Sequence, residues 1–243
     1  MTEDQLEQEV LGWLAEIGYT PINGYDIAPD GPSAERADYV QPLLLERLKA
    51  AIARLNPHIP LVARDDAIAQ LKELGIPALL SSNRRFHNLL LGGVPVQYQK
   101  DGETRGDFVR LVDWENAPGS NEFLAVKQYT LKGPKHSRRP DIILFVNGLP
   151  LVVFEFKSSI REEASLFSAY DQLTNRYKRD IPDLFKYNAF CIISDGVNTK
   201  SGSFFAPYEF FYAWRKTEGM PNEVDGIDAM FTLIQGMFHR KRL

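Results

Sequence analysis

Long apolar runs and cysteine are both scarce in this 243-residue sequence. The single cysteine, Cys191, excludes an internal disulfide and suits a reducing compartment, and its apolar neighbours predict a buried thiol. No apolar run approaches the length of a membrane span, and the acidic N-terminus, MTEDQLEQEV, has no signal-peptide core. These absences predict a cytoplasmic protein without membrane contact.

Motifs for several reaction classes are also missing. No G-x-x-x-x-G-K-[ST] loop occurs, so the chain by itself should not bind ATP in the P-loop manner. No Ser-His-Asp or Cys-His arrangement stands out, and His58 and His87 lack the spacing of metal ligands. The composition, 44% hydrophobic and 25% charged, is that of an ordinary globular protein.

The net charge of −4 is not typical of a nucleic-acid-binding protein, but the charge is unevenly distributed. Residues 127–179 contain ten Lys or Arg and only five Asp or Glu. A basic segment in this region is either a solvated loop or a surface that contacts phosphates. Its candidate DNA-binding residues are Lys132, Lys135, Arg138 and Arg139.

The stretch RRPDIILFVNGLPLVVFEFKSS organises the rest of the chain. It predicts two strands, Ile142 to Val146 and Leu149 to Phe156, joined at Asn147-Gly148, a strong hairpin signal. Strands that are apolar on both faces belong in the middle of a sheet that is covered on each side. The sequence therefore predicts an α/β protein with a central sheet.

Three charged residues interrupt this apolar hairpin: Asp141, Glu155 and Lys157. A charge in a core is costly unless it is paired or holds a metal. Glu155 and Lys157 are two apart and share one face of their strand. They form either an ion pair where the strand surfaces or, with Asp141, a site for a hard cation beside a positive group.

The order Pro140-Asp141, a hairpin, then Glu155-x-Lys157 resembles the signature of the PD-(D/E)XK nuclease superfamily. The whole stretch is closer still to the restriction (motor) subunit of type I restriction-modification enzymes. Further segments carry the same resemblance: Leu55-Asn56-Pro57, Phe86-His87 to Gly93-Val94, Gln128-Tyr129 and Ile181-Pro182-Asp183-Leu184-Phe185.

The resemblance implies a restriction-endonuclease-like mixed sheet flanked by helices, with an extra helical N-terminal part. It implies one endonuclease domain: a mainly helical part over 1–93, a nuclease core over 94–200, and an extension over 201–243. In the family a helicase motor follows this extension, so we expect an N-terminal fragment, in which ATP would act only through the absent motor.

The resemblance also implies the activity and its partners. Asp141, Glu155 and Lys157 would be catalytic, with Mg²⁺ on the two carboxylates, and would cut double-stranded DNA without sequence preference. The partners would be modification and specificity subunits. The alternatives are a repair or junction nuclease of the same fold and a non-catalytic DNA-binding or subunit-docking module.

The hairpin register decides whether the two carboxylates meet. Simple pairing across a two-residue turn places Asp141 opposite Phe154, on the wrong face for Glu155. A three-residue loop, or a bulge with Gly148 in the left-handed region, shifts the register by one. We predict this shifted register.

Two helices supply further site residues. A helix from Thr2 to Ile17 carries Glu7, which is either a solvated glutamate or, by resemblance, a third metal ligand. A helix from Arg161 to Arg179 carries Gln172, a catalytic candidate by resemblance to a Gln-x-x-x-Tyr motif. Tyr177 lies one residue too far for that motif, and a regular helix would turn it away from Gln172. It is a DNA-contact candidate, with a core aromatic as the alternative.

The remaining elements are predicted from periodicity and breakers. A loop is expected from Pro21 to Ser33, and the aromatic run from Phe204 to Trp214 either packs against the sheet or stacks bases. Further helices are expected over 37–55, 64–74, 81–91 and 224–237, and further strands over 94–99, 108–112, 122–130 and 189–194.

Overall fold

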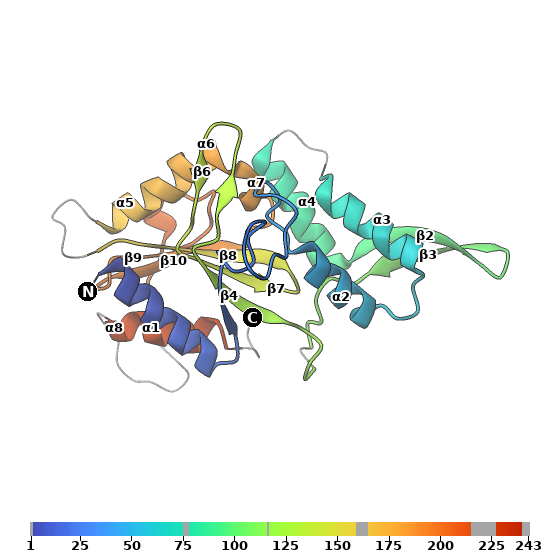
Figure 1. Cartoon of the computed structure of the whole chain (residues 1–243), viewed down its shortest axis with the longest axis horizontal. Helices are drawn as coiled ribbons and strands as arrows, with labels where there is room; N and C mark the ends of the chain where they lie inside the picture. Colours follow the sequence, from blue (N-terminus) through green and yellow to red (C-terminus); the bar gives the residue numbers. More distant parts are fainter. Residues whose placement is uncertain (1, 75–77, 116, 159–164, 215–226, 240–243) are drawn as a thin grey trace.

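The computed structural model describes residues 2–74, 78–115, 117–158, 165–214 and 227–239 (Figure 1). Its centre is a six-stranded mixed sheet in the order β1-β4-β7-β8-β9-β10. The pairs β1–β4 and β8–β9 are parallel, and the other neighbours are antiparallel. The strands are β1 (Thr20–Asn23), β4 (Phe123–Lys127), β7 (Ile142–Val146), β8 (Leu149–Phe156), β9 (Phe190–Ser194) and β10 (Thr199–Gly202). This confirms the predicted α/β class and the restriction-endonuclease-like sheet.

Helices cover both faces of the sheet, as the two-sided apolar strands require (Figure 1). Helices α1 (Glu3–Glu16) and α8 (Ile227–Met237) pack together on one face. The other face carries α5 (Leu166–Asp171), the π-helical segment η1 (Gln172–Tyr177), α6 (Lys178–Asp180) and α7 (Pro182–Phe185). Along β8 the side chains alternate between the two cores: Phe154 and Phe156 pack with α1 and α8, and Val153 packs with α5 and η1.

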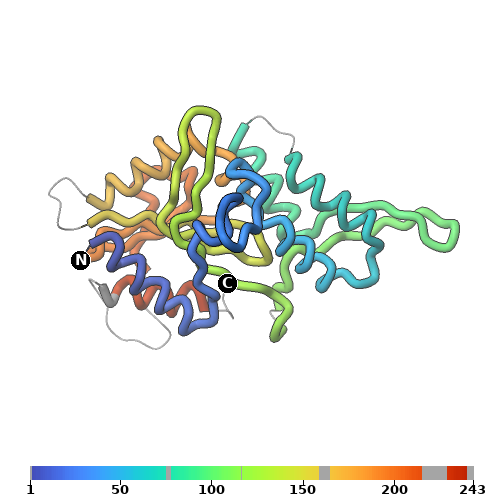
Figure 2. Tube along the Cα trace, viewed as in Figure 1, coloured from blue at the N-terminus to red at the C-terminus, as the bar shows by residue number. Residues whose placement is uncertain are grey.

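A helical part with a long hairpin adjoins the sheet and extends from it (Figure 2). It contains α2 (Leu45–Leu55), α3 (Leu61–Lys72), α4 (Leu79–Gly92), and the hairpin of β2 (Val94–Lys100) and β3 (Glu103–Val109). The predicted helix over 37–55 is wrong for its first eight residues. Pro42 disfavours helical geometry at Gln41 before it, and the Leu44 N–H donates to the Gly148 carbonyl at 3.0 Å, so α2 begins only at Leu45.

Four short strands, β1, β10, β5 (Leu131–Lys132) and β6 (Ser137–Arg138), were not predicted from the sequence. The predicted loop from Pro21 to Ser33 is wrong at its start, because Pro21 to Asn23 belong to β1, an edge strand that tolerates proline. Strand β10 has only four residues, and they are mostly polar. Strands β5 and β6 form a small separate hairpin.

The predicted aromatic packing is confirmed around the short 3₁₀ helix η2 (Tyr208–Phe210). Phe204 and Phe211 are buried, and the Phe204 ring stacks on Phe185 at 3.6 Å. Phe210 and Tyr212 remain exposed. The starts of the predicted helices over 161–179 and 224–237 lie outside the described residues. No helix in the described part of the chain is both long and apolar enough to cross a membrane.

The turn of the central hairpin is a two-residue turn. Asn147 and Gly148 have φ values of 52° and 81°, the positive pair that a type I′ turn requires. The Asn147 side chain is buried and donates to the Leu111 carbonyl at 2.9 Å, while its oxygen accepts from the Glu122 N–H at 2.8 Å. The turn is therefore held by tertiary contacts as well as by its own geometry.

Gly148→Ala is expected to lower the free energy of unfolding by about 3 kcal/mol, because φ is positive and a Cβ would lie 2.5 Å from the Leu44 carbonyl oxygen. Gly102→Ala, in the β2–β3 turn, is the matched control. Its φ is 82° but a Cβ would meet nothing within 4 Å, so a loss of only about 1 kcal/mol is expected. Urea unfolding measures both, and equal losses would contradict the close approach at Gly148.

Candidate active site

The shifted register of the hairpin is confirmed, but its cause differs from the expected one. Val146 pairs with Leu149 across the two-residue turn, and a bulge then skips Leu151, so that Leu144 pairs with Val152. Ile142 consequently pairs with Phe154, which puts the preceding Asp141 opposite Glu155. The bulge in β8, and not the turn, brings the two carboxylates to the same face.

Asp141 precedes β7 and is fixed through its backbone and its side chain. Its carbonyl accepts from the Gln128 N–H at 2.9 Å, and its Oδ2 accepts from the Phe156 N–H at 2.6 Å. Oδ1 accepts no hydrogen bond from the residues that the structure describes. One carboxylate oxygen is therefore held while the other remains free for a ligand.

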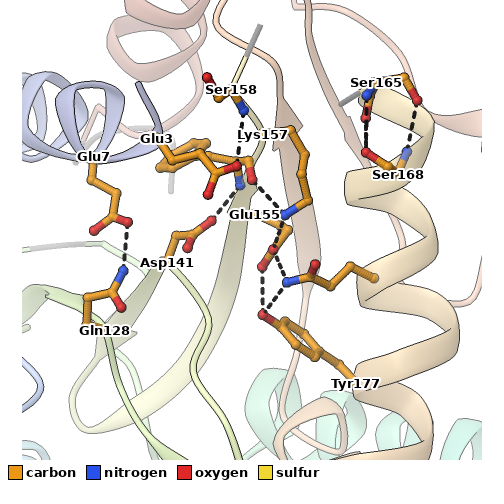
Figure 3. A network of polar contacts seen from close by, with 12 residues as sticks. Glu3, Glu7, Gln128, Asp141, Glu155, Lys157, Ser158, Ser165, Ser168 and Tyr177 are labelled. Atoms are coloured by element: carbon orange, nitrogen blue, oxygen red, sulfur yellow. Dashed lines mark hydrogen bonds and ion pairs between the residues drawn. The ribbon is translucent and has the colours of Figure 1, made fainter. Parts of the chain in front are cut away.

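Glu155 is almost completely buried, with 1% of its surface exposed, and three donors surround its carboxylate (Figure 3). Oε1 accepts from Lys157 Nζ at 2.9 Å and from Gln172 Nε2, and Oε2 accepts from the Tyr177 hydroxyl at 2.9 Å. Lys157 Nζ also donates to the Phe156 carbonyl at 2.9 Å. The Glu155–Lys157 ion pair thus exists, and it forms part of a larger network.

The π-helical segment η1 explains how both Gln172 and Tyr177 reach Glu155. A regular helix would separate side chains five residues apart, but a π-helix repeats at i→i+5 and aligns them. Gln172 Nε2 donates to the Tyr177 oxygen at 2.9 Å. The prediction that Tyr177 points away from Gln172 is therefore wrong, because the π-helix accommodates the extra residue between them.

Burial raises the pKa of both carboxyl groups. The pKa of Asp141 rises to about 9, first through desolvation and then through repulsion from Glu155. Desolvation also raises the pKa of Glu155, against the lowering effect of Lys157. Two carboxyl groups that resist ionisation side by side are typical of functional sites.

Helix α1 brings two more carboxylates to this end of the sheet. Glu7 Oε1 accepts from Gln128 Nε2 at 2.6 Å, and desolvation raises the pKa of Glu7. Glu3, one turn earlier, accepts from the Ser158 N–H at 3.1 Å. Glu3 was not predicted as a site residue, although its i,i+4 spacing from Glu7 places both on one helix face.

A pocket of about 330 Å³ is lined by six of the predicted site residues, whereas Glu155 and Lys157 are not among its lining residues. Arg176 and Gln128 belong to it as well and were not predicted, since neither lies within the hairpin motif. The lining residues are Glu3, Glu7, Gln128, Ser137, Arg138, Arg139, Asp141, Gln172, Arg176 and Tyr177.

The predicted DNA-contacting residues fall into separate places. Arg138 and Arg139 line the pocket, but Arg138 Nε also donates to the buried Asp180 at 2.6 Å. Lys132 lines a different cavity, beside Pro134 and Leu184, and Lys135 is exposed. The structure therefore brings Arg138 and Arg139 to the carboxylates and leaves Lys132 and Lys135 outside the pocket.

The donor set can be compared with what a metal requires. Among the described residues, no group of three or more His, Cys, Asp or Glu could hold a metal ion, so Asp141 and Glu155 stand as a pair. Mg²⁺ suits such a pair, because it keeps several waters and binds through one or two carboxylates plus phosphates. The repulsion that raises the pKa of Asp141 is the interaction that a cation would offset. The residues present fit Mg²⁺, and the role of Glu7 as a further ligand stays a prediction.

Comparison with known proteins identifies the family. The family model described as the type I restriction enzyme R protein N terminus matches residues 1–210. The chain is 39% identical over 216 residues to the HindI type I restriction enzyme endonuclease subunit of Haemophilus influenzae, covering 88% of this chain and 20% of that protein. It is 29% identical over 222 residues to a Methanocaldococcus jannaschii protein named as a candidate MjaIXP endonuclease subunit, covering 90% and 21%.

The chain thus spans about a fifth of the length of these relatives. The match begins with α1, includes the whole carboxylate hairpin and the π-helical segment, and ends at the aromatic run. The site described above therefore lies entirely within the matched region. The chain belongs to the type I restriction enzyme R protein family, in its N-terminal part.

Proposed function

We propose that this chain is the DNA-cleaving part of a type I restriction enzyme and hydrolyses phosphodiesters with Mg²⁺. One observation carries the proposal: the bulge in β8 places Asp141 opposite Glu155, with Lys157 bonded to Glu155, beside a pocket lined by arginines. The names of the relatives, endonuclease subunits of type I restriction enzymes, support the same activity.

Each side chain has a part in the proposed hydrolysis. Asp141 and Glu155 would hold Mg²⁺, which when bound would supply an activated water and offset negative charge on the phosphate. Lys157, only 17% exposed, orients that water and adds positive charge near the transition state. Arg139 and Arg176 lie at the pocket and are exposed, so they can pair with the phosphates of the substrate.

The proposal extends to partners. Phosphate contacts carry no sequence information, so the recognition sequence would come from a specificity subunit and the complex would also contain a modification subunit. ATP would be used by a motor in the remainder of a longer protein. Double-stranded DNA is the proposed substrate.

The test is cleavage of supercoiled plasmid by the 243-residue chain with Mg²⁺ or Mn²⁺, with and without EDTA. Weak, metal-dependent nicking without fixed sites is expected, because this acidic chain alone has little hold on DNA. Efficient cutting at one sequence would refute the proposal that recognition lies elsewhere. The absence of any metal-dependent nicking, together with the absence of Mn²⁺ binding, would refute the activity.

Tyr177→Phe is expected to lower the nicking rate by about 10-fold, because Glu155 loses a donor that fixes its carboxylate. Gln172→Ala is expected to lower it by more, since Gln172 holds both Glu155 and Tyr177. Tyr187→Phe is the matched control: its hydroxyl donates to the Leu71 carbonyl at 3.0 Å, within a different core, so the rate should not change. Equal rates for Tyr177→Phe and Tyr187→Phe would contradict the role of the network.

A further inference from the structure

Gln128 has an unusual backbone for its position. Only three non-glycine residues in the described parts of the chain have a positive φ: Asp101, Gln128 and Asn147. Asp101 and Asn147 occupy two-residue hairpin turns, where such angles are required. Gln128, with φ of 56°, directly follows β4 and lies in no such turn. A left-handed glutamine is strained, and strain of this kind collects at functional sites.

The backbone and side chain of Gln128 reach two different carboxylate-bearing segments. Its N–H donates to the Asp141 carbonyl at 2.9 Å, which fixes the chain just before β7. Its side-chain Nε2 donates to Glu7 Oε1 at 2.6 Å, which fixes a side chain of α1 (Figure 3). All three residues line the same pocket. One residue therefore connects the Glu7 carboxylate to the backbone of Asp141.

The hydrogen bond from Gln128 engages only one of the two carboxylate oxygens of Glu7. Oε2 accepts no hydrogen bond from the described residues, although the Glu7 side chain is largely buried. Glu7 and Asp141 line the same pocket, and Glu7 contributes to the repulsion that raises the pKa of Asp141. Among the described residues these carboxylates form no direct three-ligand metal site with Glu155, so Glu7 would act on a cation only through its waters. A hydrated Mg²⁺ keeps several waters, and a nearby carboxylate can act through those waters.

We propose that Gln128 is a positioning residue that holds Glu7 so that its free oxygen accepts hydrogen bonds from the waters of the cation on Asp141 and Glu155. This rests on the metal site of the proposed function. A purely structural role, docking α1 onto β4, predicts a loss of stability and no change in metal affinity. A positioning role predicts weaker metal binding without a loss of stability, because hydrogen bonds to the carboxylates around a metal ion set the affinity of the site for that ion.

The experiment measures Mn²⁺ binding to the 243-residue chain by electron paramagnetic resonance, alongside thermal unfolding without metal. Gln128→Gly removes the amide and relieves the left-handed strain, and Gln128→Asn tolerates the same backbone but is one methylene shorter. Both variants should bind Mn²⁺ about 10-fold more weakly, and Gln128→Gly should unfold at the same temperature or higher. Unchanged Mn²⁺ affinity in both variants overturns the proposal.

Two controls separate positioning from other effects. Asp101→Gly relieves similar strain in the distant β2–β3 turn and should leave Mn²⁺ affinity unchanged. In a Glu7→Gln background, Gln128→Gly should have no further effect, because Gln128 acts through Glu7. Additive losses in that double variant would overturn the proposal.

Asp141→Asn distinguishes a failure of the positioning role of Gln128 from a failure of the metal site of the proposed function. If it abolishes Mn²⁺ binding while the Gln128 variants bind normally, only the role of Gln128 fails. If it leaves Mn²⁺ binding intact, the metal site of the proposed function fails, and the role of Gln128 fails with it.

Discussion

Asp141→Asn is expected to lower metal-dependent DNA nicking by about 10³-fold. A bound cation contributes several kcal/mol to stabilising the transition state, and each 1.36 kcal/mol is a factor of ten in rate. The amide keeps the shape of the carboxylate and can still accept from the Phe156 N–H, so the hairpin should fold unchanged. What it loses is the negative charge that holds the cation opposite Glu155.

The rate is measured under single-turnover conditions with the chain in excess over supercoiled plasmid. Asp183→Asn is the matched control, since Asp183 pairs with Lys186 at 2.6 Å near the surface and lies outside the pocket. Its rate should equal that of the unmodified chain. If Asp141→Asn nicked DNA at half the normal rate or faster, the carboxylate pair would not be the catalytic centre.

The hairpin could be predicted because its signals are local. Alternating and continuous apolar runs, with Asn147-Gly148 between them, give both strands at their observed bounds. The register was predicted from the chemistry of the carboxylates and is confirmed. The bulge at Leu151 was not predicted, although Pro150 beside it is a local signal: proline cannot donate to the strand ladder and occurs in central strands mainly at bulges.

The π-helix and the pocket lining could not be predicted from local sequence patterns. The extra residue between Gln172 and Tyr177 is visible in the sequence, but a regular helix predicts the wrong direction for Tyr177, because only a π-helix aligns residues five apart. The tertiary network around Glu155 is what stabilises the wider turn. Arg176, Gln128 and Glu3 were missed because their relevance depends on contacts between elements that are distant in sequence.

The short strands and the segment before α2 were mispredicted for a related reason. Strand β1 contains only four residues, one of them proline, and exists because β4 offers it an edge. The residues from Ala37 to Leu44 carry helical periodicity, but Pro42 overrides it locally. For β1 the contact with a neighbouring strand, and for residues 37–44 a single proline, outweighed the secondary structure that the apolar periodicity predicts.

Without metal, the chain should become less stable as the pH rises from about 4 to about 9. Asp141 has a folded-state pKa of about 9, against an ordinary aspartate pKa of 3.8, so the folded protein keeps a proton that the unfolded chain has lost. Stability is therefore fully present below the unfolded pKa and is lost as the pH rises through the folded pKa. Converting this pKa difference at 1.36 kcal/mol per unit, and reducing the result by roughly half for partial solvent access, gives a loss of about 4 kcal/mol in the free energy of unfolding.

Asp141→Asn isolates this effect, because the amide does not titrate. Urea unfolding in EDTA at pH 5, 7 and 9 should show the variant and the unmodified chain nearly equal at pH 5 and the variant more stable at pH 9. Mn²⁺ should restore stability at pH 9 to the unmodified chain alone, since a cation stabilises the ionised carboxylate that the variant lacks. Parallel pH profiles for the two proteins would mean that Asp141 ionises freely in the fold. The same variant that removes catalysis is thus expected to yield the more stable metal-free protein, because the charge required for the reaction is the charge that opposes folding.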